Sequence, residues 1–92
     1  MKVFQTNLFY KSFKKLHKNQ KKILDKAIQK ITKNPALGSI KKGDLAEVQV
    51  YKFKMLSQLI LLAYTYNAKN KTLVLLAFGT HENFYRDLKK VK

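Results

Sequence analysis

The spacing of the apolar residues changes near Leu45, and this change constrains the fold more than any other feature of the sequence. Before Leu45, apolar residues recur three or four positions apart, as on one face of an α-helix. After Leu45, they fill short segments bounded by polar turns, as in β-strands. The chain is therefore predicted to be an α+β domain in which helices pack on a sheet.

A short strand is predicted at residues 2–5, followed by a helix that Thr6 or Asn7 can cap and that runs to about His17. One apolar stripe of this helix contains Phe9, Phe13 and Leu16. Because the stripe has helical spacing, it is interpreted as core rather than as a surface for stacking bases.

A second helix is predicted from a cap at Asn19 to Asn34, where it ends because the residue before a proline is disfavoured in the helical region. Two helices joined by a short turn are expected to form an antiparallel hairpin. The segment 36–44 contains two glycines and no periodicity, and it is a predicted loop.

The second half is predicted to contain three strands and a last short helix. The strands cover residues 45–55, 58–66 and 72–78, and the last two are apolar at nearly every position, as central strands are. Consecutive strands should pair as an antiparallel meander, and Thr80 can cap a helix over residues 81–91. The expected order is β-α-α-β-β-β-(α), a small antiparallel sheet with a helical hairpin on one face and the opposite face available.

With 92 residues, the chain is expected to form one domain over residues 1–92. Its 20 Lys and Arg against 5 Asp and Glu give a formal net charge of +15. Self-repulsion of this size opposes folding, and a polyanion or an acidic protein partner offsets it. Nucleic acid, an anionic membrane and an acidic protein are therefore the candidate partners, although a solvated lysine-rich surface also accounts for part of the charge.

The composition excludes several classes of site. There is no Cys, so disulfides and cysteine nucleophiles are absent. The two His and five acidic residues lack metal-ligand spacing, and no cofactor motif is present, so neither a metal nor a cofactor is expected. No apolar segment is long enough to cross a membrane, which predicts a soluble, cytoplasmic protein without membrane contact.

Tyr51-Lys52-Phe53-Lys54 is the first candidate for chemistry, because side chains alternate along a strand. If Tyr51 and Phe53 face the helices, then Lys52 and Lys54 line the open face, where two ammonium groups can hold a phosphate and stabilise its developing charge. Taken alone, the same pattern is more typical of an ordinary half-buried strand.

His81, Tyr85 and Arg86 form a second group, at the junction of the last strand and the last helix. His can exchange a proton near neutral pH, Tyr85 lies four residues later on the same helical face, and Arg86 can bind a phosphate with two hydrogen bonds. The alternative is structural, with His81 in a capping turn, Tyr85 packed on the sheet and Arg86 paired with Glu82.

The order of elements, the Tyr51–Lys54 strand and the segment Gly79–Leu88 resemble the RelE/ParE superfamily of bacterial type II toxins. The resemblance implies the corresponding fold and an acidic or amphipathic cognate antitoxin that covers the basic surface. Members of the RelE branch cut mRNA in the ribosomal decoding site, and members of the ParE branch poison DNA gyrase and lack the nuclease residues.

The resemblance to the RelE branch implies catalytic roles for Lys52, Lys54, His81 and Tyr85, with Arg86 as a nearby extra cation. The family's arginine at the start of the following strand has no counterpart in residues 58–61. The retained lysines favour a ribosome-dependent mRNA endoribonuclease that inhibits translation and needs no metal. The alternatives are a gyrase inhibitor without nuclease activity and a non-catalytic basic module that binds RNA or DNA.

Overall fold

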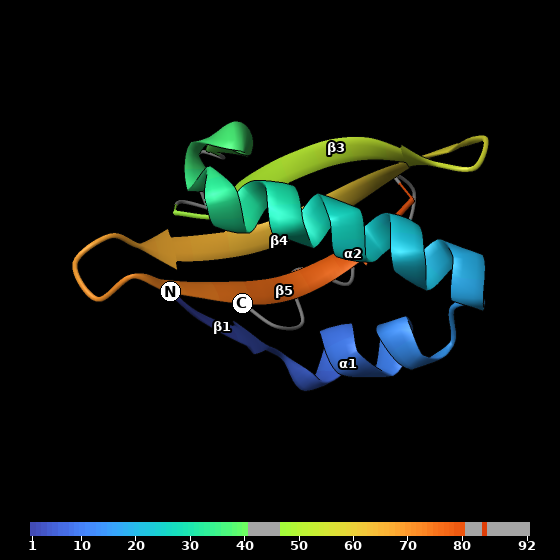
Figure 1. Cartoon of the computed structure of the whole chain (residues 1–92), viewed down its shortest axis with the longest axis horizontal. Coiled ribbons are helices and arrows are strands. Elements are labelled where there is room, and N and C mark those ends of the chain that lie inside the picture. Colours follow the sequence, from blue (N-terminus) through green and yellow to red (C-terminus); the bar gives the residue numbers. More distant parts are fainter. Residues whose placement is uncertain (41–46, 81–83, 85–92) are drawn as a thin grey trace.

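The computed structural model describes residues 1–40, 47–80 and 84, in which two helices pack on a five-stranded sheet (Figure 1). The elements in chain order are β1 (Lys2–Gln5), α1 (Asn7–Lys14), α2 (Lys18–Lys33), the 3-10 helix η1 (Pro35–Leu37), β2 (Ser39–Ile40), β3 (Gln49–Met55), β4 (Gln58–Asn67) and β5 (Thr72–Gly79). The α+β class and the order of the main elements are confirmed. The predicted helix over residues 81–91 lies outside the described residues, apart from Phe84.

The strands are arranged in the order β1-β5-β4-β3-β2. β3, β4 and β5 form the expected antiparallel meander, and β1 joins the other side of β5 as a parallel neighbour, so the sheet is mixed. The predicted loop also contains η1 and the two-residue strand β2. Glu47 and Val48 precede β3 rather than belonging to it, and the positive φ of Glu47, 73°, is incompatible with an extended strand.

The helix boundaries differ from the predicted ones because a turn separates the helices earlier than expected. α1 ends at Lys14, and His17 is the N-cap of α2 rather than the last residue of α1. The backbone N–H of His17 donates to Oε1 of Gln20 at 2.9 Å, which fixes the start of α2. Asn19 therefore lies inside the first turn of α2.

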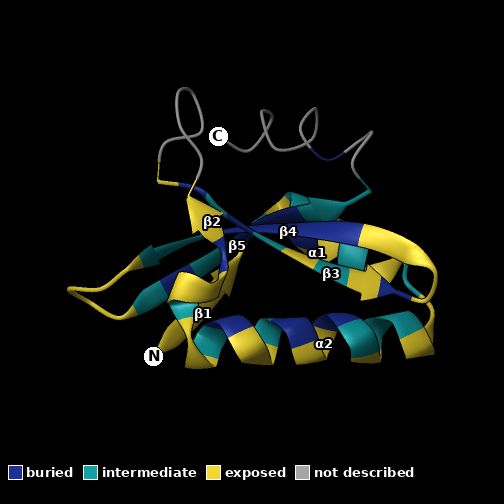
Figure 2. Cartoon of the chain, turned by 90° about the horizontal axis from the view of Figure 1, so that it is seen from above, coloured by how far each residue is buried: buried dark blue, intermediate teal, exposed yellow. Residues whose placement is uncertain are grey.

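The sheet is apolar on both faces, which explains why β4 and β5 are apolar at consecutive positions. Figure 2 shows α2 lying along one face. The larger cluster, beneath the helices, includes Phe9, Leu24, Ile31, Leu62 and Leu73. The smaller cluster lies on the opposite face and includes Val48, Val50, Leu61, Ala63, Leu76, Ala77 and Phe84. The opposite face is therefore only partly available.

Tyr64 joins the sheet to the η1–β2 segment through a buried hydrogen-bond network. Its hydroxyl accepts from the Gly38 N–H at 2.8 Å and donates to the Pro35 carbonyl at 2.6 Å. The Gln49 side chain donates to the same carbonyl at 2.6 Å. These bonds satisfy the backbone where the chain leaves α2 and enters the sheet.

Candidate functional site

The lysines of β3 lie on the open face of the sheet, as the alternation predicts. Tyr51 and Phe53 pack against the helical cluster, with their rings stacked at a centroid distance of 6.0 Å. Lys52 and Lys54 are exposed and have the opposite parity. Since alternate residues of a strand are about 7 Å apart, the two ammonium groups can reach one phosphate together.

The strand next to the lysines provides apolar neighbours rather than a further cation. Lys52 is paired with Leu61, and Lys54 with Leu59. Leu61 is buried, whereas Leu59 keeps 47% of its surface exposed beside Lys54. The residues of β4 at this position thus leave the lysine pair without the arginine that the resemblance would require.

Gly79, the last residue of β5, lies on the strand next to β4, two strands from Lys52. Gly79 is paired with Leu61, which in turn is paired with Lys52, so Gly79 and Lys52 lie two strand spacings apart, about 10 Å. Two residues after Gly79 the chain reaches His81.

Phe84 lies on the same face of the sheet as the lysines. Its side chain is buried in the smaller cluster with Val50 and Leu61, and its N–H donates to the Thr80 carbonyl at 2.9 Å. His81, Tyr85 and Arg86 lie outside the described residues. Their convergence with Lys52 and Lys54 therefore stays a prediction. Phe84 is the described residue that lies nearest to them in the sequence.

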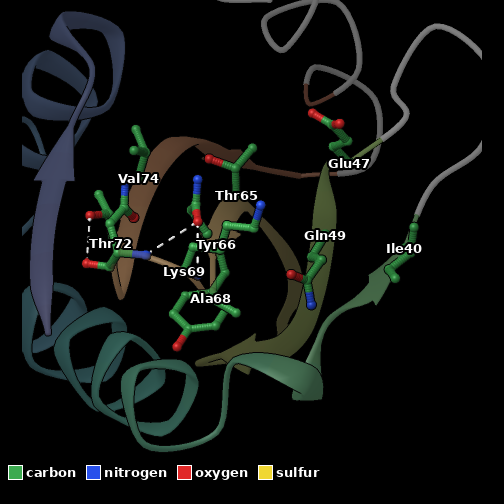
Figure 3. A pocket seen from close by; sticks show the side chains of 11 residues that line it. Ile40, Glu47, Gln49, Thr65, Tyr66, Ala68, Lys69, Thr72 and Val74 are labelled. Carbon is green, nitrogen blue, oxygen red and sulfur yellow. Dashed lines mark hydrogen bonds between the residues drawn. The ribbon is translucent and has the colours of Figure 1, made fainter.

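A separate pocket of about 780 Å³ lies at the other end of β3, β4 and β5, away from the lysine pair (Figure 3). Part of its polar lining forms hydrogen bonds within the fold. Gln49 donates to Pro35 and Gly38, and the Asn67 side chain accepts from the Lys69 and Asn70 backbones. We therefore place the candidate site at the lysine pair and not in this pocket.

Two further observations concern the described part of the chain. It contains no cluster of three or more His, Asp or Glu side chains that could hold a metal ion. None of its helices is long and apolar enough to cross a bilayer. The sequence does not distinguish Tyr64 or Leu59 from their neighbours, because both stand in an apolar strand whose pattern does not indicate which residues form a buried hydrogen bond or remain exposed.

The sequence matches a family model described as the ParE-like toxin of type II bacterial toxin-antitoxin systems over residues 3–89. No protein with a curated functional description matches it significantly.

Several solved structures share the fold. A YoeB/ParE toxin from Agrobacterium tumefaciens is 15% identical with a TM-score of 0.72, and the alignment covers 88% of this chain and 99% of that one. The toxin–antitoxin complex RelBE of E. coli gives 18% identity and a TM-score of 0.68, covering 86% of this chain and 94% of that one. The archaeal RelE–RelB complex from Pyrococcus horikoshii gives 15% identity and a TM-score of 0.61, and the alignment covers 86% of this chain and 92% of that one.

Proposed function

The chain belongs to the ParE-like toxins of type II bacterial toxin-antitoxin systems, and we propose that it is a ribosome-dependent endoribonuclease that cuts mRNA and so inhibits translation. The observation that carries the proposal is the exposed pair Lys52 and Lys54 on the open face of the sheet. The proposed setting is the bacterial cytoplasm, where a cognate antitoxin neutralises the protein. The structures of RelE-type toxins in complex with antitoxins support such a partner.

The proposed reaction needs positive charge and a proton carrier but no metal. The 2′-oxygen of a ribose loses its proton and attacks the neighbouring phosphorus, a 2′,3′-cyclic phosphate forms, and the 5′-oxygen leaves with a proton. Lys52 and Lys54 bind the phosphate and stabilise the charge that develops on it. His81 takes and returns the proton, Tyr85 orients a base, and Arg86 adds a cation.

The decisive experiment measures mRNA cleavage in a translating extract. Lys54→Ala and His81→Ala should each lose about 100-fold or more in cleavage rate, because charge stabilisation and proton transfer act mainly in the transition state. Ribosome binding should fall much less. Lys30→Ala, which removes an exposed lysine from α2, is the matched control and should cleave normally.

Inhibition of DNA gyrase is the second candidate, and a specific feature favours it: Leu59 and Leu61 flank the lysines where the nuclease reading requires an arginine. Measuring mRNA cleavage and supercoiling by gyrase in the same extracts distinguishes the two candidate functions. If the wild type leaves mRNA intact and abolishes supercoiling by gyrase, the nuclease proposal is wrong and the gyrase proposal replaces it. If both activities are absent and RNA is bound, the protein is a non-catalytic binding module.

A further inference from the structure

The described sheet has a gap beside the end of β4. β3 begins at Gln49, which is paired with Tyr64, whereas β4 continues to Asn67 and is paired with β5 alone in this last part. In the same register Glu47 would lie opposite Tyr66, but its positive φ of 73° directs the chain away from an extended path. We call the pocket beside these last residues of β4, which is shown in Figure 3, the β4 notch.

The backbone of Tyr66 offers the β4 notch a donor and an acceptor. The Leu75 carbonyl accepts a hydrogen bond from β1, so Val74, the residue before Leu75, uses its backbone groups for β4. Val74 is paired with Thr65. The N–H and C=O of Tyr66, the next residue of β4, therefore point to the opposite side, where no described strand is paired with them.

The side chains of the β4 notch leave further polar groups for a ligand. Glu47, Thr65 and Tyr66 line it together (Figure 3). Within the described part of the chain, no hydrogen bond or ion pair engages the carboxylate of Glu47 or the hydroxyl of Thr65. Lys69, in the turn between β4 and β5, adds a cation. The volume of about 780 Å³ lies within the range of about 300–1,000 Å³ that is typical of small-molecule sites.

We propose that the β4 notch binds the guanine base of a nucleotide. The Watson–Crick edge of a base carries a donor beside an acceptor, which can pair with the N–H and C=O of Tyr66 as another strand would. An ionised carboxylate only accepts hydrogen bonds, so Glu47 selects a base with one more donor. Guanine has this donor, because its 2-amino group lies beside its N1–H. Lys69 can bind the phosphate of the same nucleotide.

The β4 notch is separate from the lysine pair. Thr65 is four residues beyond Leu61, the partner of Lys52, and so lies about 13 Å from it along the strand. The inference therefore does not rest on mRNA cleavage. A free guanine nucleotide and a guanosine within RNA present the same base, and the test distinguishes these two sources.

The test titrates the full, isotope-labelled chain with guanosine monophosphate and follows the backbone amides by NMR. We expect saturable shifts at Glu47, Thr65 and Tyr66. Inosine monophosphate lacks only the 2-amino group and should bind about 10-fold more weakly, the size of one lost base contact. Adenosine, cytidine and uridine monophosphates carry the same phosphate and should also bind more weakly, which separates recognition of the base from attraction of the charge.

A pair of variants assigns the contact to one carboxylate. Glu47→Ala should weaken binding of guanosine monophosphate by about 10-fold and leave binding of inosine monophosphate nearly unchanged, because only the first ligand has the 2-amino group. Asp25→Ala removes the same charge from an exposed position of α2 and should leave both affinities unchanged. Thermal melting confirms that both variants fold.

A short oligonucleotide of adenosines with one guanosine, compared with adenosines alone, identifies the source. Selective binding of the guanosine-containing strand at the same amides supports a base within RNA, and selective binding of the mononucleotide alone supports a free nucleotide. The proposal is overturned if neither ligand binds selectively, if the shifts lie outside the β4 notch, or if Glu47→Ala and Asp25→Ala weaken binding equally. Cleavage of mRNA without guanine binding would overturn this inference alone, and guanine binding with intact mRNA would overturn only the proposed nuclease.

Discussion

The hydroxyl of Tyr64 is a single group whose loss should lower the free energy of unfolding substantially. Replacing it by Phe deletes a buried hydroxyl that serves Gly38 and Pro35, and leaves the Gly38 N–H without its acceptor. An unsatisfied buried donor costs about 1–3 kcal/mol, so we expect Tyr64→Phe to lower the free energy of unfolding by that amount. Chemical denaturation measures it, and Tyr10→Phe, at an exposed position, is the control.

The same hydroxyl should make stability depend on alkaline pH. Burial raises the pKa of Tyr64 above its ordinary value of 10.0, and the Gly38 N–H opposes this only in part. The unfolded chain therefore releases this proton at lower pH than the folded one, and stability falls as pH rises above about 10. The difference in unfolding free energy between wild type and Tyr64→Phe should narrow between pH 9 and 11. A constant difference would contradict the assignment.

Gly38 provides an independent test of the same contact. A Cβ at this position would lie 2.6 Å from the Tyr64 hydroxyl oxygen and 2.9 Å from its ring. Since Tyr64 is buried and cannot move aside, we expect Gly38→Ala to lose about 1–3 kcal/mol, as overpacked sites do. Gly79→Ala is the matched control, because nothing lies within 4 Å of its added Cβ. Equal stabilities of the two variants would show that the packing around Tyr64 is loose.

At the scale of elements, the features that follow from local sequence patterns were predicted correctly. The alternation in Tyr51–Lys54 correctly placed the aromatic rings under the helices and the lysines on the open face. Of the two predicted cap residues, Thr6 and Asn7, the structure has Thr6 as the cap, because its hydroxyl accepts from the Phe9 N–H at 3.1 Å. Both predictions depend on neighbours in the sequence.

The parts that were missed depend on contacts between distant segments. β2 has two residues, too few to show a period, and the parallel pairing of β1 with β5 joins positions about 70 residues apart. The Thr6 hydroxyl also donates to the Leu76 carbonyl at 2.7 Å, beside the irregularity in the β4–β5 register. No local pattern indicates such a bond, and none indicates whether His81 and Tyr85 meet the lysine pair.

The β3–β4 hairpin contains a strained residue that can be relieved. Leu56 has a φ of 58° and is 62% exposed, so it pays the steric cost of a left-handed conformation and buries little. That cost is about 1–2 kcal/mol for an L-residue and nearly absent for glycine, whose greater freedom when unfolded takes back part of the gain. We expect Leu56→Gly to raise the melting temperature by a few degrees. Ser57→Gly, the neighbouring control without a positive φ, should lower it.

At the scale of the whole molecule, experiment should separate the contribution of the net charge to RNA binding from the contribution of the lysine pair to cleavage. Every phosphate neutralised by a lysine releases counterions. The logarithm of the affinity for single-stranded RNA should therefore fall linearly with the logarithm of the salt concentration, with a slope of about 0.7 per contact. A net charge of +15 makes this attraction strong wherever the lysines lie. The position of a lysine should affect only the rate of mRNA cleavage.

Two double variants test this separation, and each removes two positive charges. Lys52→Ala with Lys54→Ala changes the open face, and Lys26→Ala with Lys30→Ala changes exposed positions of α2. For RNA that touches both surfaces, each pair should reduce the salt slope by about 1.4, since two contacts are lost. Only the first pair should lose mRNA cleavage in the translating extract, by about 100-fold or more, because only those lysines are proposed to stabilise the transition state. Equal losses of cleavage would place the site elsewhere, and binding that is insensitive to salt would remove nucleic acid as the main partner.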